Sequence, residues 1–222
     1  IYANSTGDID LVASVILSYD EKDLDMVQNY NYSQDYILTE TPKLAFVKGP
    51  VWGFGEDDMQ EQIVKFIKNL SFEVEELNLG DDFNEAASSH EIIMNGSIAK
   101  SLSQYYKTEK EKLHPFTISR IEAGFPVSAK QYIESIENAK KMQQTLNKIF
   151  NKFDAIITPA APGQAPRDLM NTGNAIFNGY WTMMGVPAIS LPLLKGKDSL
   201  PIGVQIITCL LYTSDAADDW SS

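Results

Sequence analysis

Apolar residues recur at helical spacing in several separate segments of the chain. The first of these stripes predicts a helix over residues 6–19, for which Thr6 and Asp8 are the candidate N-caps. A later stripe, over residues 129–150, follows Ser128, whose hydroxyl suits an N-cap position. The same periodicity predicts further helices over residues 56–70, 84–106 and 175–184.

Short runs with strand patterning alternate with these helices. They occupy residues 43–48, 72–79, 154–158, 188–191 and 202–207. The first two runs flank a predicted helix, so they should form a βαβ unit with parallel strands. The last two are joined by a loop and suit an antiparallel, hairpin-like pair. Together the elements predict an α/β fold, a single domain in which helices flank a mixed β-sheet.

The stretches between these elements carry weaker patterns. Residues 20–42 are typical of a long surface connection, and residues 108–126 resist assignment because two X-Pro pairs interrupt them. Prolines at 159, 162 and 166 predict that the chain stops pairing after the 154–158 strand and leaves the sheet. A loop in that place lies where ligands gather in open α/β sheets, although it could equally serve only to turn the chain.

The charge balance excludes several classes of partner. The chain has 18 Lys and Arg residues against 30 Asp and Glu residues, a formal net charge of −12. Such a surface repels phosphate backbones and anionic lipid, so neither nucleic acid nor a membrane is expected as a direct partner. No apolar run approaches the roughly 20 residues that a membrane-spanning helix needs.

Cysteine and histidine are too sparse for a disulfide framework or a metal centre. Cys209 is the single cysteine, which fits a reducing compartment, and we expect a cytoplasmic protein. His90 and His114 are far apart in the sequence and match no ligand spacing. The sequence therefore predicts no metal site.

Ser97 and Lys100 match the S-x-x-K spacing of penicillin-recognising acyl enzymes. The partner motifs S-D-N and K-T-G are absent from the sequence. The surrounding pattern is that of an amphipathic helix, so a solvated helix face is the preferred interpretation of this pair.

Several strand-to-loop junctions together resemble the amidase-signature family. They are residues 154–166, 172–174, 181–182, 185–192 and 200–206, which follow the order and approximate spacing of the C-terminal region of that family. The resemblance extends upstream through residues 43–70 and 6–11, so that residues 1–207 are covered. A linked series of motifs is far more specific than any one of them.

The resemblance implies hydrolysis of a carboxylic amide through a serine acyl-enzyme, by a lysine and two serines, with no metal or organic cofactor. The Gly-Gly-Ser-Ser-Gly-Gly loop of the family has no match here, because the only Gly-Ser pair is Gly96-Ser97. No catalytic residue is therefore assigned. We expect residues 1–207 to be the C-terminal portion of a single amidase domain, and residues 208–222 to be a non-native tail.

The resemblance also implies which residues shape the substrate cavity. Thr158 and Pro159 end the 154–158 strand, while Thr172, Asn174 and Trp181 belong to the following segment that faces the acyl site in the family. These five residues are the predicted substrate-binding positions. Trp181 carries an alternative interpretation, because large aromatic side chains fill cores more often than they line pockets.

The resulting functional hypothesis is a fragment of an amidase that acts on a small-molecule amide and is inactive alone. One alternative is the A subunit of a tRNA-dependent amidotransferase, which shares this C-terminal organisation. Another is a non-catalytic scaffold with the amidase fold. Missing sheet neighbours should expose apolar surface and favour aggregation, and a homodimer is left open.

Overall fold

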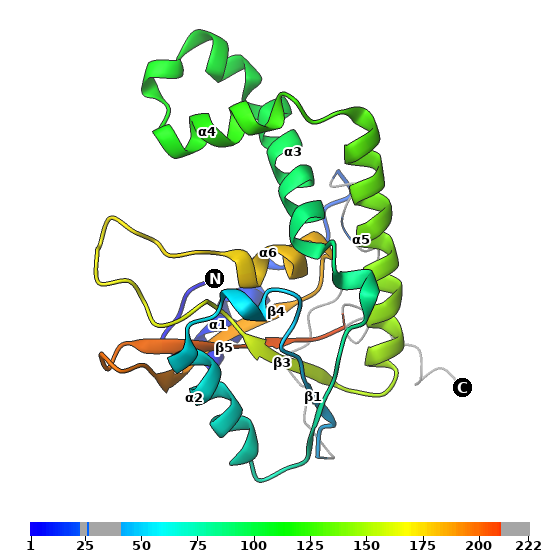
Figure 1. Cartoon of the computed structure of the whole chain (residues 1–222), viewed down its shortest axis with the longest axis vertical. Helices are drawn as coiled ribbons and strands as arrows, with labels where there is room; N and C mark the ends of the chain where they lie inside the picture. Colours follow the sequence, from blue (N-terminus) through cyan, green and yellow to red (C-terminus); the bar gives the residue numbers. More distant parts are fainter. Residues whose placement is uncertain (23–25, 27–40, 210–222) are drawn as a thin grey trace.

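A five-stranded mixed sheet organises the chain in the computed structural model, which describes residues 1–22, 26 and 41–209 (Figure 1). The strands, in the order β2-β1-β3-β5-β4 across the sheet, are β1 (Leu44–Phe46), β2 (Val74–Glu76), β3 (Ala155–Pro159), β4 (Ala188–Lys195) and β5 (Pro201–Ile207). β1 pairs in parallel with β2 and β3, whereas β5 is antiparallel to β3 and β4. The predicted α/β class, the parallel βαβ unit and the antiparallel last pair are confirmed.

Helices cover the sheet and extend beyond it (Figure 1). They are α1 (Thr6–Ile16), α2 (Asp57–Lys68), α3 (Ala86–Thr108), α4 (Pro115–Gly124), α5 (Ala129–Phe150) and α6 (Ile176–Met183), with 3-10 turns at Trp52–Phe54, Asp81–Phe83 and Lys110–Lys112. All five predicted helices are present. α5 begins after Ser128, as predicted, and a capping box with Gln131 stabilises that end because each side chain binds the other residue's backbone N–H.

Helix α4 lies in the segment that the sequence pattern left unassigned. Pro115 occupies its first turn, where a missing N–H costs nothing. The His114 side chain caps the helix, since its Nδ1 accepts a hydrogen bond from the Phe116 N–H at 3.2 Å. The proline that interrupts the sequence pattern therefore starts a helix.

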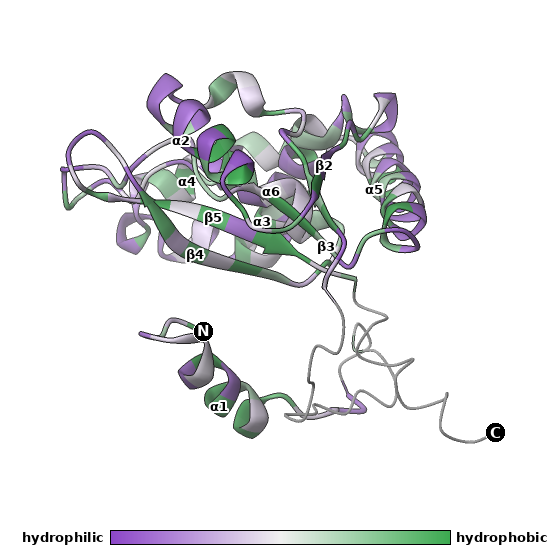
Figure 2. Cartoon of the chain, turned by 90° about the horizontal axis from the view of Figure 1, so that it is seen from below, coloured by the Kyte–Doolittle hydropathy of each residue, from purple (hydrophilic) through white to green (hydrophobic). Residues whose placement is uncertain are grey.

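Helix α1 is shorter than predicted and is capped one residue earlier. Ser5, in an extended conformation, accepts a hydrogen bond from the Asp8 N–H at 3.1 Å, so Ser5 is the N-cap and the expectation of Thr6 or Asp8 was wrong. Figure 2 shows α1 apart from the sheet, and several of its large apolar side chains are exposed.

The core lies around the middle of the sheet. Every residue of the central strand β3 is buried, because strands flank it on both sides and helices pack over it. The largest fully buried side chains are Trp181, Tyr180, Phe46, Phe83, Phe177 and Met59. Burial of this size is the main source of stability for such a domain.

Pairing along β3 continues further than its prolines predicted. Pro159 is still in register with Val204, and the Ala160 N–H donates to Gly203 O at 3.0 Å. Neighbouring residues of a strand direct their backbone groups to opposite sides, and Ile157 O accepts from Val47 on the β1 side. The missing N–H of Pro159 thus falls on the β1 side, which leaves the ladder to β5 intact, so the expected departure at residue 159 was wrong.

Parts of the predicted surface connection at 20–42 and of the predicted tail at 208–222 lie outside the described residues. None of the described helices combines the length and the apolar composition that a membrane span requires. The described part of the chain contains no group of His, Cys, Asp and Glu side chains that could hold a metal ion.

Candidate functional site

Thr158 and Gln205 face each other near the carboxyl end of β3. They are register partners in the antiparallel ladder between β3 and β5. Residues directly opposite in such a ladder project from the same face of the sheet. Both are buried, although each carries a polar side chain in an otherwise apolar strand.

Helix α6 brings two aromatic side chains into the same part of the core. Tyr180 and Trp181 are each 1% exposed, and their ring centroids lie 4.7 Å apart at an interplanar angle of 37°. The helix begins after Asn174, whose Oδ1 accepts a hydrogen bond from the Ile176 N–H at 3.0 Å. This contact replaces the side-chain cap that Ala175, the N-cap residue, does not supply.

Four side chains here have buried polar atoms that make no hydrogen bond of good geometry within the described chain. The atoms are Thr158 Oγ1, Tyr180 Oη, Trp181 Nε1 and Gln205 Nε2. Burial raises the pKa of the Tyr180 phenol, while weak hydrogen-bond contacts with the Thr158 and Trp181 side chains lower it. We call these four residues the buried polar cluster. A buried polar group that is left unpaired costs about 1–3 kcal/mol, so this cluster is a candidate for contact with a ligand.

Gly49, just after β1, packs against this cluster. It has a φ of +76°, which favours glycine, and a Cβ at this position would come within 2.6 Å of Tyr180 Oη. Gly49 also lines a hollow of about 530 Å³ at the carboxyl ends of β1 and β2. Lys48 and Glu76 line the same hollow and form an ion pair of 2.6 Å.

The sequence matches the amidase family over residues 1–211. The chain belongs to the amidase family. Its mixed sheet, helices and structural neighbours agree with the amidase-signature fold that the motifs at 154–206 predicted.

Relatives and solved structures of the family extend beyond this chain. The A subunit of glutamyl-tRNA(Gln) amidotransferase from Koribacter versatilis is 31% identical over 121 residues, 49% of this chain and 25% of that protein. The corresponding protein of Clostridium botulinum strain Hall is 26% identical over 238 residues, covering 90% of this chain and 49% of that protein. The structure of 6-aminohexanoate cyclic dimer hydrolase matches with a TM-score of 0.74 and 18% identity, over 97% of this chain and 51% of that one. The chain thus spans about half the length, or less, of these relatives.

The structure brings only part of the predicted substrate-binding set together. Thr158, Pro159 and Trp181 are buried at or beside the carboxyl end of β3. Thr172 and Asn174 are exposed and lie in the loop between β3 and α6. Trp181 packs against Tyr180 in the core, which agrees with the alternative interpretation that this side chain fills the core. A role in substrate binding stays a prediction for all five residues.

Sequence reasoning assigned no role to Tyr180 or Gln205. A signal for Gln205 exists, because a glutamine within the apolar run 202–207 is an unusual choice for a buried strand. Tyr180 gives no such signal, since its neighbours are aromatic or apolar and its hydroxyl meets Thr158 only through the packing of α6 on the sheet.

Ser97 and Lys100 do not form a site of their own. Ser97 Oγ shares a hydrogen bond of 3.2 Å with Tyr132 Oη on α5, and Lys100 is exposed. Ser97 therefore belongs to the contact between α3 and α5, which differs from the solvated face that the pattern favoured.

Proposed function

We propose that residues 1–207 form the C-terminal portion of a single amidase domain and supply one wall of its acyl-binding pocket. The observation that carries the proposal is the buried polar cluster at the carboxyl end of β3, in a chain that belongs to the amidase family. Unpaired hydroxyl, indole and amide groups suit contact with the polar atoms of an amide substrate or with the groups that orient it.

The proposed reaction is hydrolysis of the carbon–nitrogen bond of a small-molecule amide. A serine oxygen attacks the carbonyl carbon, the amine leaves, and water then hydrolyses the acyl ester. Because residues 1–222 contain no Gly-Gly-Ser-Ser-Gly-Gly loop, we place the nucleophile, the bridging serine and the lysine outside them. The part assigned to this chain is to shape the acyl pocket and exclude water from it.

The five predicted positions divide this task between a rigid floor and a loop. Thr158, Pro159 and Trp181 are fixed by the sheet and α6, and they supply the floor. Thr172 and Asn174 lie on the exposed loop, and we assign to them further contacts to the substrate. The domain needs no metal or organic cofactor for this chemistry, and we propose a cytoplasmic location.

The A subunit of a tRNA-dependent amidotransferase is the second candidate. Its specific support is that curated relatives carry this name, at 26–32% identity. The net charge of −12 argues against direct tRNA contact by this part of the protein, so a partner protein would have to hold the tRNA. A non-catalytic scaffold is the third candidate, and it predicts no acyl chemistry from any assembled form.

A serine-reactive phosphonate separates the two enzymatic candidates from the scaffold. The purified 222-residue chain should show neither covalent labelling nor amide hydrolysis, because it lacks the nucleophile loop. The chain extended by the coding sequence that precedes Ile1 should be labelled on a serine of that extension and should hydrolyse amides. Stoichiometric labelling of the 222-residue chain that disappears in Ser97→Ala would overturn the proposal. An extended chain that is never labelled would favour the scaffold.

A further inference from the structure

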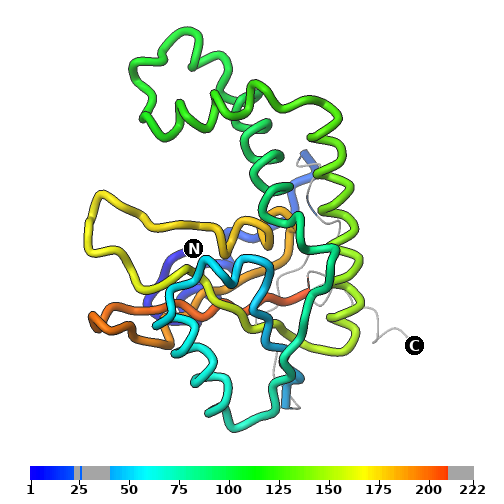
Figure 3. The backbone as a smooth tube through the Cα atoms, viewed as in Figure 1, coloured from blue at the N-terminus to red at the C-terminus, as the bar shows by residue number. Residues whose placement is uncertain are grey.

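The loop between β3 and α6 passes beside the turn between β4 and β5. The β3–α6 loop (residues 160–175) and the β4–β5 turn (residues 196–200) project on the same side of the sheet in Figure 3. They are adjacent because β3 and β5 pair, although neither is close to the other in sequence. Three residues join them.

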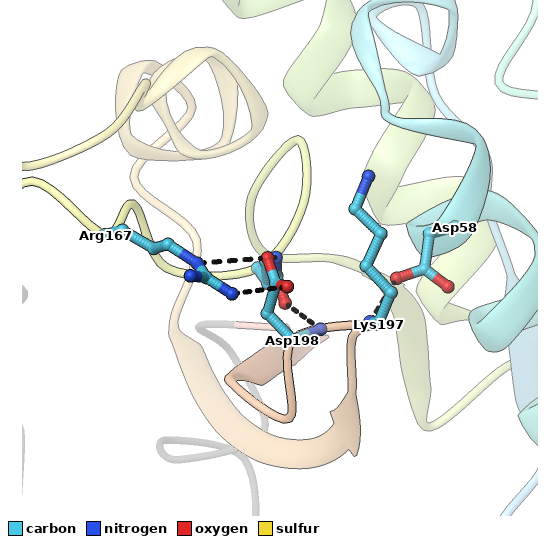
Figure 4. Close-up of polar contacts among 5 residues, drawn as sticks. Asp58, Arg167, Lys197 and Asp198 are labelled. Atoms are coloured by element: carbon cyan, nitrogen blue, oxygen red, sulfur yellow. Dashed lines mark hydrogen bonds and ion pairs between the residues drawn. The ribbon is translucent and has the colours of Figure 1, made fainter.

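Asp198 of the turn holds two residues of the loop at once (Figure 4). Its Oδ1 accepts a hydrogen bond from Arg167 Nη2 at 2.6 Å, and its Oδ2 accepts from Arg167 Nε at 3.3 Å. Oδ2 also accepts from Gln164 Nε2 at 2.6 Å, while the Asp198 N–H donates to Gln164 Oε1 at 3.2 Å. The arginine contact is a two-pronged fork and the glutamine contact is reciprocal, so both fix direction as well as distance.

The turn is shaped to receive Gln164. A Cβ on Gly196 would come within 2.5 Å of Gln164 Oε1, so only a glycine leaves room for this side chain. The turn is itself held to the start of α2, because the Lys197 N–H donates to Asp58 Oδ2 at 2.9 Å (Figure 4). The anchor point is therefore fixed to the body of the domain.

The loop beyond this anchor has little else to hold it. Leu169 and Met170 are almost fully exposed. Hydrogen bonds between Asp168 and Asn171, and between Asn171 and Gly173, are local to the loop. Such bonds fix the shape of the segment, but they do not fix its place on the domain. That place depends on its two ends. The near end is held by the Asp198 contact and by the Glu56 N–H, which donates to Pro162 O at 2.7 Å, and the far end is held by the start of α6.

An exposed ion pair alone would not carry this argument. The Arg167 side chain is 74% exposed, and pairs of that kind contribute little because water screens them. Asp198 is less exposed, at 29%, and it also binds the half-buried Gln164. Loss of Asp198 therefore removes two anchors, whereas loss of Arg167 removes one.

We propose that Asp198 is a positioning residue, which fixes the β3–α6 loop through Gln164 and Arg167 and thereby sets the place of Thr172, the loop residue to which a substrate contact is assigned. This inference rests on the proposed function for the role of Thr172. The anchoring itself follows from the contacts around Asp198 and is independent of any activity.

Hydrogen exchange of the 222-residue chain tests the anchoring. In Asp198→Asn, amides of residues 160–175 should exchange about five- to tenfold faster than in the unsubstituted chain, and Arg167→Gln should have a smaller effect. The swap of Arg167→Asp with Asp198→Arg should recover part of the protection by restoring the ion pair. Glu134→Gln, which removes an exposed carboxylate on α5 paired to Lys130 at 3.6 Å, is the matched control and should change nothing in the loop.

Unchanged exchange of residues 160–175 in Asp198→Asn would overturn the anchoring. If hydrogen exchange accelerates equally in every peptide of Asp198→Asn, the double swap of Arg167 and Asp198 distinguishes the causes. A general loss of stability predicts no recovery of protection in the swap, whereas the anchoring predicts partial recovery in residues 160–175. In the amidase assembled with its serine region, Asp198→Asn should raise KM for the amide and leave kcat within about twofold. A loosened loop with an unchanged KM would refute the substrate role of Thr172 and leave the anchoring standing.

Discussion

The imidazole ring of His90 lies directly against the backbone of Gly179. A Cβ on Gly179 would come within 2.5 Å of both Cε1 and Nδ1 of the ring. His90 belongs to α3 and Gly179 to α6, so this contact sets how closely the two helices approach. Tyr180 and Trp181 follow Gly179 directly, which makes the position of the buried polar cluster depend on it.

Gly179→Ala should destabilise the domain even though alanine favours helices. In an open helix this change gains up to about 1 kcal/mol, whereas overpacking against His90 costs about 1–3 kcal/mol. Urea unfolding should show the net loss as a lower midpoint. Gly53→Ala is the control, because a Cβ there meets nothing within 4 Å.

A second substitution identifies the cause. In a His90→Ala background the space beside Gly179 is open, so Gly179→Ala should then be neutral or stabilising. An equal loss in both backgrounds would contradict an origin in the His90 contact.

Stability should fall as the solution is acidified through the range where histidine titrates. Burial lowers the pKa of His90, with Glu91 raising it and Arg120 lowering it further by smaller amounts. The unfolded chain, with a histidine pKa of about 6.5, then binds more protons than the folded chain at and below that pH. Unfolding free energy measured between pH 5 and 8 should rise with pH, and His90→Asn should flatten part of that rise. Parallel curves for the two proteins would exclude His90 as the source.

Tyr180→Phe should leave stability unchanged or raise it. The hydroxyl is buried, makes no hydrogen bond of good geometry and lies near Gly49, so its removal deletes a desolvated polar atom while the ring packing stays. Tyr180→Ala should in contrast cost about 3–5 kcal/mol through the lost ring. The urea midpoints of both variants check this, and a loss above about 1 kcal/mol in Tyr180→Phe would reveal a hydrogen bond to that hydroxyl.

The isolated chain should associate with itself through α1. Leu11 and Val15 are 61% and 76% exposed and lie one helical turn apart on α1. Exposed apolar stripes of this kind promote association. Leu11→Gln with Val15→Gln should therefore lower the average mass in sedimentation, whereas Phe54→Gln, at an exposed aromatic residue outside α1, should not. A monodisperse unsubstituted chain would be contrary to this expectation.

Local patterns in the sequence predicted local structure well. Helix α5 runs over the predicted residues because its stripe and its Ser128 cap both lie within the segment itself. Helix α4 was missed because a proline breaks a helix in its interior but is favoured in its first turn, where Pro115 lies. Pairing through Pro159 was missed because the sequence does not state on which side of a strand a missing N–H falls.

The candidate site was predicted only in part. Linked motifs singled out Thr158, Pro159 and Trp181, which are all buried at or beside the end of β3, and their role in substrate binding stays a prediction. Tyr180 and Gln205 were assigned no role, because their nearness to Thr158 arises from the packing of α6 and the register of β5. The hydrophobic periodicity of a sequence does not encode contacts of this kind.

The amino-acid sequence by itself determined five of the helices and the five strands in outline, and it carried the motifs that place the chain in the amidase family. Hydrophobic periodicity and helix capping depend on residues that are neighbours along the chain, so the sequence alone can predict them. Only the tertiary structure decided that β3 lies between β1 and β5, that Tyr180 meets Thr158, and that Asp198 holds the β3–α6 loop. Those contacts join residues distant in sequence, and they form because the apolar faces of many elements are buried together.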